Sequence, residues 1–388
     1  MARRPRILSI SFSNYVADAR VLRQLRVLSE YGDVTTIGHG PTPEGSSEHL
    51  RLDEKLSSLP QTVSGIVKLA FRRHRSVEFD APAVREAIRV LTGRQFDLIV
   101  ANEARALPLA HRISHGAPVW GDMHEWAPEE RTHVLSWRLL VAPFMRYICA
   151  EYLPRTQAVT TVNGSIARLY DEQFGTRSQI VRNAIPLQDL YPTEVKADRI
   201  RLVHSGGAIR GRSLETLIAA TLLLDERFTL DFYLVKARDG GKYLSELKRL
   251  AGDSPRIVFH DAVPPRGLPT VLNEYDIGVY SIPPRTTNQE FMLPNKFFDF
   301  VQARLALVFG PSVETSALIT QFGLGRITDD FSAGSLVRVL QELTGEAVQK
   351  FKANSHAAAI ALSSVGDEST QRQILAELLN VAPQTTQE

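Results

Sequence analysis

The feature that most constrains the fold is a strand–helix–strand order that occurs in both halves of the chain. A strand-like run at residues 6–12 precedes an amphipathic stretch at 19–31 and a second strand-like run at 34–37. In the second half, a run at 200–204 precedes a helical pattern at 214–224 and a further strand-like run at 229–235. Patterns in this order are typical of βαβ units, whose strands are parallel. We therefore expect an α/β protein with two Rossmann-like domains that face each other across a cleft.

The length of the chain also favours two domains. With 388 residues, 44% of them hydrophobic and 23% charged, the chain is too long for one ordinary core. A polar, proline-bearing stretch at 186–198 is the expected linker. We expect an N-terminal domain at 1–186, a C-terminal domain at 199–365, and a last helix with a loose tail at 366–388.

Composition excludes several classes of protein. The single cysteine, Cys149, cannot form an intramolecular disulfide, which favours a protein of the reducing cytoplasm. Cys149 is expected to be a small buried apolar residue. A net charge of +2 provides no general attraction for nucleic acid. The longest apolar stretch, near 139–145, is far shorter than the roughly 20 residues that span a bilayer. Any membrane contact is therefore expected to be peripheral, at the inner face of the cell membrane.

One helical stretch, at 63–75, has a pattern with two interpretations. Its apolar residues recur at helical spacing, at Val63, Ile66, Val67 and Ala70. Its second half is basic, with Lys68, Arg72, Arg73 and Arg75. Such a helix can lie on an anionic membrane surface. It can equally pack its apolar side on the sheet as an ordinary surface helix.

A helix beginning near Pro294 has the chemistry of a nucleotide-diphosphate site. Pro294 favours a helix start, and Asn295 is expected to cap it. The unpaired N–H groups of a helix start attract phosphate, and Lys296 adds a positive charge. Asp299, one turn later, offers acceptor oxygens for a ribose diol. The alternative is an ordinary solvated pair of Lys296 and Asp299.

A second candidate phosphate site is the loop at 205–213. Gly206 and Gly207 allow the backbone to approach a ligand closely, and Arg210 and Arg212 place positive charge before a helix. The alternative is a plain strand-to-helix turn with solvated arginines.

In the first half, Asp122, His124 and Glu125 follow a strand at 118–120. Carboxylates and an imidazole in a loop after a strand suit acid–base chemistry or contacts to sugar hydroxyls. A histidine beside acids is also often structural.

Several segments together resemble the GT-B glycosyltransferases of family 4, which transfer a sugar from a nucleotide donor with retention of anomeric configuration. The matching segments occur in family order over nearly the whole chain, at residues 18–21, 121–125 with 128–129, 181–183, 207–214 and 294–299.

The resemblance implies roles for individual residues. Arg212, with Gly207, is expected to contact the donor pyrophosphate, and Lys296 is expected to be a second cation for it. Asp299 corresponds to the carboxylate that binds the ribose, and His124 to the residue that faces the transferred sugar. The backbone at Val263 is expected to meet the nucleobase.

Four positions depart from the family pattern. Asp299 stands where Glu is usual, and Phe291 stands where many members have a second Glu, for which neighbouring Glu290 could substitute. Arg304 replaces an expected Gly, and Gly206 occupies the place of the first pyrophosphate arginine, for which Arg210 could compensate.

We therefore expect a retaining, metal-independent glycosyltransferase that moves a sugar from a nucleotide-diphosphate donor to a hydroxyl of a glycan, a lipid-linked acceptor or a cell-envelope precursor. No cofactor is expected, because the sugar nucleotide is a substrate, and the chain has no Asp-x-Asp pair for a metal. The alternatives are a sugar-nucleotide epimerase of the same fold and a non-catalytic sugar-nucleotide or glycan-binding protein. The expected catalytic residues are His124, Asp122 and Glu125, and the expected donor-binding residues are Gly206, Gly207, Arg210, Arg212, Val263, Glu290, Asn295, Lys296 and Asp299.

Overall fold

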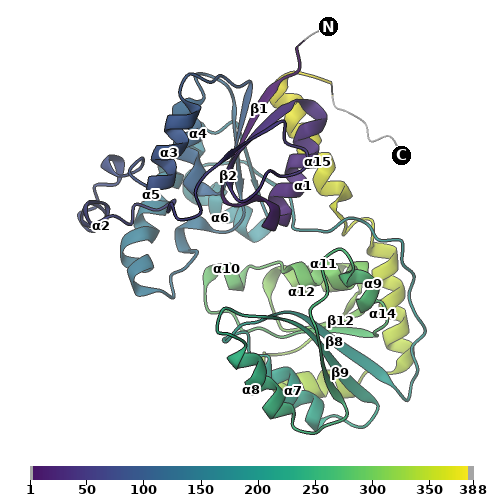
Figure 1. The fold of residues 1–388 in the computed structure, drawn as a ribbon. Coiled ribbons are helices and arrows are strands. Elements are labelled where there is room, and N and C mark those ends of the chain that lie inside the picture. Colours follow the sequence, from purple (N-terminus) through teal and green to yellow (C-terminus); the bar gives the residue numbers. More distant parts are fainter. Residues whose placement is uncertain (1–2, 383–388) are drawn as a thin grey trace. The chain divides into compact units, whose positions relative to one another are not determined.

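The structure, a computed structural model, describes residues 3–382, which form two compact units. Of the described residues, the first unit contains 3–182, the short segment Thr286–Asn288 and 367–382. The second unit contains Asn183–Arg285 and Gln289–Gly366. Each unit has helices on both faces of its sheet (Figure 1).

The first unit is built on a seven-stranded parallel sheet with the order β3-β2-β1-β4-β5-β6-β7. Its strands are β1 (Arg6–Asn14), β2 (Asp33–His39), β3 (Glu48–Arg51), β4 (Leu98–Asn102), β5 (Val119–Met123), β6 (Ala158–Thr161) and β7 (Ser178–Ile180). Its α-helices are α1 (Ala19–Tyr31), α2 (Val63–Ala70), α3 (Pro82–Leu91), α4 (Leu107–Ile113), α5 (Ala142–Tyr152), α6 (Gly164–Phe174) and α15 (Ser364–Leu379). Shorter 3₁₀ or π turns are η1 (Tyr15–Ala17), η2 (His74–Ser76), η3 (Ala104–Ala106), η4 (Ala127–Glu129), η5 (Trp137–Val141) and η6 (Leu153–Arg155).

The second unit has a six-stranded parallel sheet with the order β10-β9-β8-β11-β12-β13. Its strands are β8 (Ile200–Ala208), β9 (Phe228–Lys236), β10 (Ile257–His260), β11 (Ile277–Tyr280), β12 (Ala306–Phe309) and β13 (Gly325–Ile327). Its helices are α7 (Glu215–Leu223), α8 (Lys242–Ala251), α9 (Leu268–Leu272), α11 (Asn295–Gln302), α12 (Val313–Phe322), α13 (Ala333–Gln341) and α14 (Gly345–Ala358), and α10 (Thr287–Glu290) begins with residues grouped with the first unit.

In each sheet the chain adds strands first toward one edge and then toward the other. The change of direction lies between β1 and β4 in the first sheet and between β8 and β11 in the second. Ligands of open parallel sheets bind beside the carboxyl ends of the strands at such a reversal. The prediction of two Rossmann-like α/β domains is confirmed, and it places the candidate donor site at the ends of β8 and β11.

The last helix packs on the first unit rather than standing apart. Ile374, Leu375 and Ala376 of α15 are buried in one cluster with residues of α1 and the first sheet. The Arg372 guanidinium donates to both carboxylate oxygens of Glu30, at 2.8 and 2.9 Å. The expected loose tail falls partly on residues 383–388, which lie outside the described residues.

Two local expectations were wrong, and one strand was not predicted. The strand that was not predicted is β3, at the sheet edge. The predicted helix 63–75 is shorter, because α2 ends at Ala70 and a separate turn, η2, follows. Strand β8 continues through Gly206 and Gly207 to Ala208, so these glycines end a strand rather than begin a loop. Among the described helices, none has both the length and the apolar character that a bilayer span requires.

Candidate functional site

The end of β8 forms a cationic pocket in the second unit. Gly206 has φ +147°, a conformation that side chains with a Cβ rarely adopt. A Cβ placed on Gly206 would lie 3.3 Å from Cε of Lys296 and 3.6 Å from Nη1 of Arg212. A Cβ on Gly207 would also lie 3.6 Å from that Arg212 nitrogen. The two cations expected to share a pyrophosphate therefore converge on the same stretch of backbone.

The charges around this pocket are only partly neutralised. Lys296 Nζ donates to Oδ2 of Asp299 at 3.1 Å, and both side chains are largely buried rather than solvated. Within residues 3–382, the guanidinium of Arg212 makes no salt bridge or hydrogen bond. An unpaired cation beside the partly buried backbone of Gly206 and Gly207 suits an anionic ligand.

Helix α11 positions Lys296 and Asp299 rigidly. Phe297, Phe298 and Val301 are fully buried in the core of the second unit, so the helix cannot rotate about its axis without breaking that packing. Its N-cap is Pro294, and no side chain caps the first turn. The expectation that Asn295 is the cap was wrong, because Asn295 is already the first helical residue and is exposed. The uncapped N–H groups are available to a phosphate.

Two residues near this pocket were missed in the sequence. His204, two residues before Gly206 on β8, is buried, and its Nδ1 lies 2.9 Å from the carbonyl oxygen of Val279 on β11. Burial, with smaller effects of Lys296 and Arg212, lowers the pKa of His204 to about 4, so the ring is neutral at pH 7. Polar residues inside a strand at a sheet reversal were the available signal.

The second missed residue is Arg285. Its Nη1 lies 3.1 Å from the position that a Cβ on Gly211 would take, and Gly211 has φ +93°. The loop between β8 and α7 therefore has an additional cation beside it, contributed by the segment after β11.

The remaining residues expected to bind the donor are Arg210, Val263 and Glu290. Arg210 is exposed, donates to both oxygens of Glu246 at 2.7 and 2.6 Å, and lies over the ring of Tyr243. The structure thus does not bring Arg210 to the pocket. Val263 packs, partly buried, against the core of the second unit, and Glu290 is exposed at the end of α10. Contacts of Val263 and Glu290 with a donor stay predictions.

Arg304, which replaces an expected glycine, fastens the preceding linker. It has φ +60° and is buried, and its guanidinium donates to the carbonyl oxygens of Gln188, Leu190 and Gln302 at 2.6, 3.1 and 2.7 Å. The residue follows the C-terminal end of α11, opposite the end that carries Lys296. Its role is therefore structural within the second unit.

In the first unit, Asp122 is the centre of a buried polar network. Arg20 donates to its two oxygens at 2.9 and 2.6 Å, Thr160 Oγ1 donates at 2.6 Å and Gln24 Nε2 at 3.2 Å. Burial alone would raise the pKa of Asp122, but Arg20 and His124 hold it well below its usual range. With its oxygens already occupied, Asp122 is suited to holding its neighbours in place.

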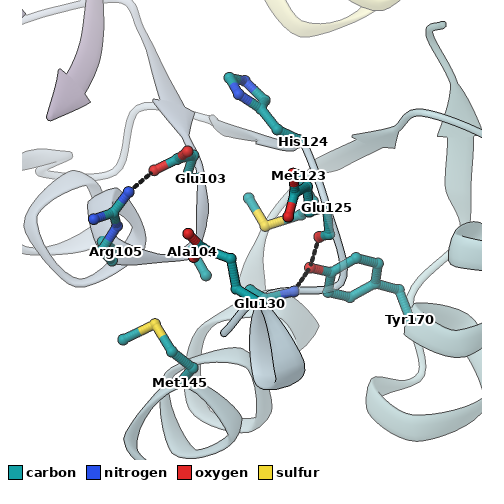
Figure 2. Close-up of a pocket in the computed structure, with 10 residues that line it drawn as sticks. Glu103, Ala104, Arg105, Met123, His124, Glu125, Glu130, Met145 and Tyr170 are labelled. Carbon is teal, nitrogen blue, oxygen red and sulfur yellow. Dashed lines mark hydrogen bonds and ion pairs between the residues drawn. The ribbon is translucent and has the colours of Figure 1, made fainter. Parts of the chain in front are cut away.

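His124 is the neighbour that this network positions. Its Nε2 lies 3.4 Å from Oδ2 of Asp122, and its side chain is 14% exposed. Burial alone would lower the pKa of His124, but the Asp122 carboxylate outweighs it and raises the pKa above the ordinary value. In Figure 2 the imidazole points away from the carboxylates of Glu125 and Glu130.

A cavity of about 160 Å³ lies beside this network and entirely within the first unit (Figure 2). Its polar lining consists of Glu103, Arg105, His124, Glu125, Glu130 and Tyr170. Glu103 is paired with Arg105, and the Tyr170 hydroxyl donates to the Glu125 carbonyl at 2.7 Å while accepting from the Ala127 N–H at 3.0 Å. Desolvation, followed by Glu130 and Glu103, raises the pKa of Glu125 to about 7.

Such a cavity can accept hydrogen bonds from hydroxyl groups and can exchange a proton near neutral pH. Glu125 was predicted from the sequence, whereas Glu130 and Tyr170 were not. Tyr170 comes from α6, distant along the chain, and Glu130 follows η4 in a stretch with no marked pattern.

Comparison with known proteins agrees with this architecture. The family model "Glycosyltransferase Family 4" matches residues 21–189. No curated protein sequence matches the chain.

Several solved structures share the fold over almost the whole chain. Sucrose-phosphate synthase from Thermosynechococcus elongatus is 15% identical, with a TM-score of 0.72, over 97% of this chain and 100% of that chain. HepE from Anabaena, in complex with UDP and glucose, is 14% identical, with a TM-score of 0.67, over 96% and 100%. A glycosyltransferase from Rickettsia africae is 12% identical, with a TM-score of 0.68, over 98% and 100%.

At these identities the similarity shows the fold, which is the GT-B arrangement of two Rossmann-like domains. The resemblance inferred from the sequence motifs is confirmed by the family match and by this fold. The chain therefore has the GT-B fold, and its residues 21–189 match the model of the family-4 glycosyltransferases.

Proposed function

We propose that the protein is a glycosyltransferase that uses a nucleoside-diphosphate sugar and transfers the sugar to a hydroxyl acceptor with retention of anomeric configuration. The observation that carries the proposal is the convergence of Lys296 and the unpaired Arg212 on Gly206, at the reversal point between β8 and β11. Solved structures of HepE contain UDP and UDP-glucose. We therefore propose a uridine diphosphate sugar as the first donor to test.

In this proposal the second unit stabilises the departing diphosphate. Negative charge grows on the diphosphate as the glycosidic bond breaks. Arg212, Lys296 and the uncapped start of α11 are fixed donors for that charge, which can lower the barrier by several kcal/mol. Asp299 is the proposed ribose ligand. Its side chain is shorter than the Glu that is usual at this position, and its Oδ2 accepts a hydrogen bond from Lys296 Nζ at 3.1 Å.

We propose that the leaving phosphate takes the proton of the acceptor hydroxyl. His124 then orients the transferred sugar, while Asp122 holds His124 in place and does not touch substrate. Substitution His124→Ala is expected to lower turnover, and full retention of turnover would contradict the role of His124.

The cavity of the first unit is the proposed acceptor site. The carboxylates of Glu103 and Glu125 can accept hydrogen bonds from sugar hydroxyls. The proposed acceptor is a hydroxyl of a glycan, a lipid-linked sugar or a cell-envelope precursor, encountered at the cytoplasmic face of the membrane.

The test is turnover with a panel of uridine and other nucleoside diphosphate sugars in the presence of hydroxyl acceptors. Release of the nucleoside diphosphate reports transfer, and NMR of the product gives its anomeric configuration. Retained configuration, with activity that survives chelation of divalent metals, is expected. An inverted product or loss of activity on chelation would contradict the corresponding part of the proposal.

A sugar-nucleotide epimerase is the second candidate, because Glu125 has a pKa of about 7 beside the carboxylate of Glu103. Incubation with UDP-N-acetylglucosamine alone separates the two activities. An epimerase changes this compound without an acceptor, whereas the proposed transferase does not. Absence of turnover with every donor would instead favour a non-catalytic binding protein.

A further inference from the structure

The first unit exposes an apolar stripe that the sequence pattern left open to two interpretations. On α2 and the residue after it, Val63 is 83% exposed and Phe71 is 75% exposed, and Ile66 and Val67 are also exposed. The helix instead buries Leu69, together with the backbone of Gly65. The interpretation in which this stripe packs on the sheet is therefore wrong. In Figure 1, α2 projects from the margin of the first unit.

A second segment, distant in the chain, extends this apolar surface. Val134, Leu135 and Leu139, in and before η5, are each 42–59% exposed. The two segments lie together, because Arg72 Nη1 donates to the carbonyl oxygen of Leu139 at 2.7 Å. We call the exposed apolar side chains of 63–71 and 134–139 the apolar patch. Contiguous exposed apolar surface of this kind marks a site of interaction.

Exposed arginines lie next to the apolar residues of the patch in the sequence. Arg73, Arg75 and Arg138 are exposed, and none of them forms a salt bridge with a residue in 3–382. Other nearby cations are already used, since Lys68 pairs with Asp80 at 2.5 Å and Arg72 bonds to Leu139. Three arginines beside the apolar patch are thus available to an anionic partner.

We propose that the apolar patch docks on the surface of an anionic lipid bilayer, with the apolar side chains in the acyl boundary and the arginines among the head groups. An interfacial helix requires this combination of an apolar face and a basic margin. A second copy of the chain fits less well, because a two-fold contact at this patch would bring the three arginines toward their own copies. The proposal does not depend on the donor pocket, which lies in the other unit.

The apolar part is tested by co-sedimentation of the full chain with vesicles of equal parts phosphatidylcholine and phosphatidylglycerol. The double substitution Val63→Ser and Phe71→Ser is expected to weaken partition roughly tenfold or more, because both exposed side chains lose their apolar contact. The matched control is Leu222→Ser with Leu223→Ser, which removes exposed apolar residues at the end of α7 and is expected to leave partition unchanged.

The charged part is tested by Arg73→Gln with Arg75→Gln on the same vesicles. Each arginine is expected to strengthen partition onto the vesicles about fivefold, so the double substitution should weaken partition roughly 25-fold. The control Arg238→Gln with Arg249→Gln removes two exposed arginines of the second unit and is expected to have no effect. Vesicles of phosphatidylcholine alone are expected to bind the wild type more weakly than the mixed vesicles.

Three results would overturn the proposal. The first is that the wild type does not bind vesicles, and the second is that it binds neutral and anionic vesicles equally. The third is that the wild type forms a dimer in vesicle-free solution and the Val63/Phe71 variant is a monomer. UDP binding, measured for every variant, is expected to stay unchanged. A failure of membrane docking is then distinguishable from a failure of the proposed transferase activity.

Discussion

Replacing Asp122 by Asn tests the positioning role that the structure gives to this carboxylate. The side chains of Asp122 and Arg20 are 1% and 6% exposed and share hydrogen bonds of 2.6 and 2.9 Å. Asparagine removes the negative charge and turns an amide donor toward other donors, so the buried Arg20 guanidinium loses the carboxylate that it faces. Breaking a buried pair in this way costs about 3–5 kcal/mol. For a unit of this size we expect the Tm to fall by roughly 6–20 °C.

Tryptophan fluorescence during urea unfolding measures this loss of stability in the first unit, which contains Asp122. The chain has three tryptophans, Trp120, Trp126 and Trp137, and all belong to the first unit. The Trp120 indole donates to Oγ1 of Thr160 at 2.9 Å, and Thr160 in turn donates to Asp122, so one probe sits next to the substitution. The control is Glu151→Gln, which breaks an exposed pair with Arg155 and should cost less than about 1 kcal/mol.

The pH dependence provides an internal check. Because the pKa of Asp122 is held below its usual range, its contribution to stability is present above an ordinary carboxyl pKa of about 4 and is lost as the pH falls toward the lowered value. The gap between wild type and Asp122→Asn should therefore narrow on acidification. A variant that is as stable as the wild type but inactive would refute the reasoning, because Asp122 would then act on the substrate.

Three further substitutions test other parts of the structure. Gly206→Ala forces a Cβ into a φ of +147° beside Lys296, and calorimetry should show UDP affinity reduced roughly tenfold or more. Arg304→Gly leaves the carbonyls held by the guanidinium without a partner, so circular dichroism should show a loss of about 2 kcal/mol in unfolding free energy, whereas unchanged stability would contradict the linker role. In Glu125→Gln, urea midpoints should decline less between pH 4.5 and about 7 than those of the wild type, because the raised pKa of Glu125 makes its ionisation unfavourable in the folded state. The decline that is left comes from Glu130 and His124, whose pKa values are also raised, and equal profiles would contradict this.

The fold was predictable because its signals are local. Strand and helix periods alternate in both halves, and parallel βαβ units follow from that order. The strand β3 was missed because Glu48–Arg51 contains a single aliphatic residue, is partly exposed and pairs only with β2 at the sheet edge. The place of α15 was missed for another reason, since its packing on α1 depends on contacts between chain ends.

The candidate site was predictable in part. Lys296 and Asp299 are one helical turn apart, so their proximity follows from helix geometry. The partner of Asp122 did not follow, because Arg20 lies on α1, far away in the sequence. Likewise, nothing near Arg210 in the sequence indicates that Glu246 pairs with it and leaves Arg212 as the cation beside Gly206.

Isothermal titration of UDP into the wild type and three single variants tests the donor pocket most directly. We predict that Arg212→Met and Lys296→Met each weaken binding at least tenfold, because each loses a charge-assisted contact to the diphosphate. Arg210→Met, whose native partner is Glu246, should change affinity less than about twofold. Equal affinities for all four proteins, or a larger loss for Arg210→Met than for the other two, would contradict the pocket at Gly206.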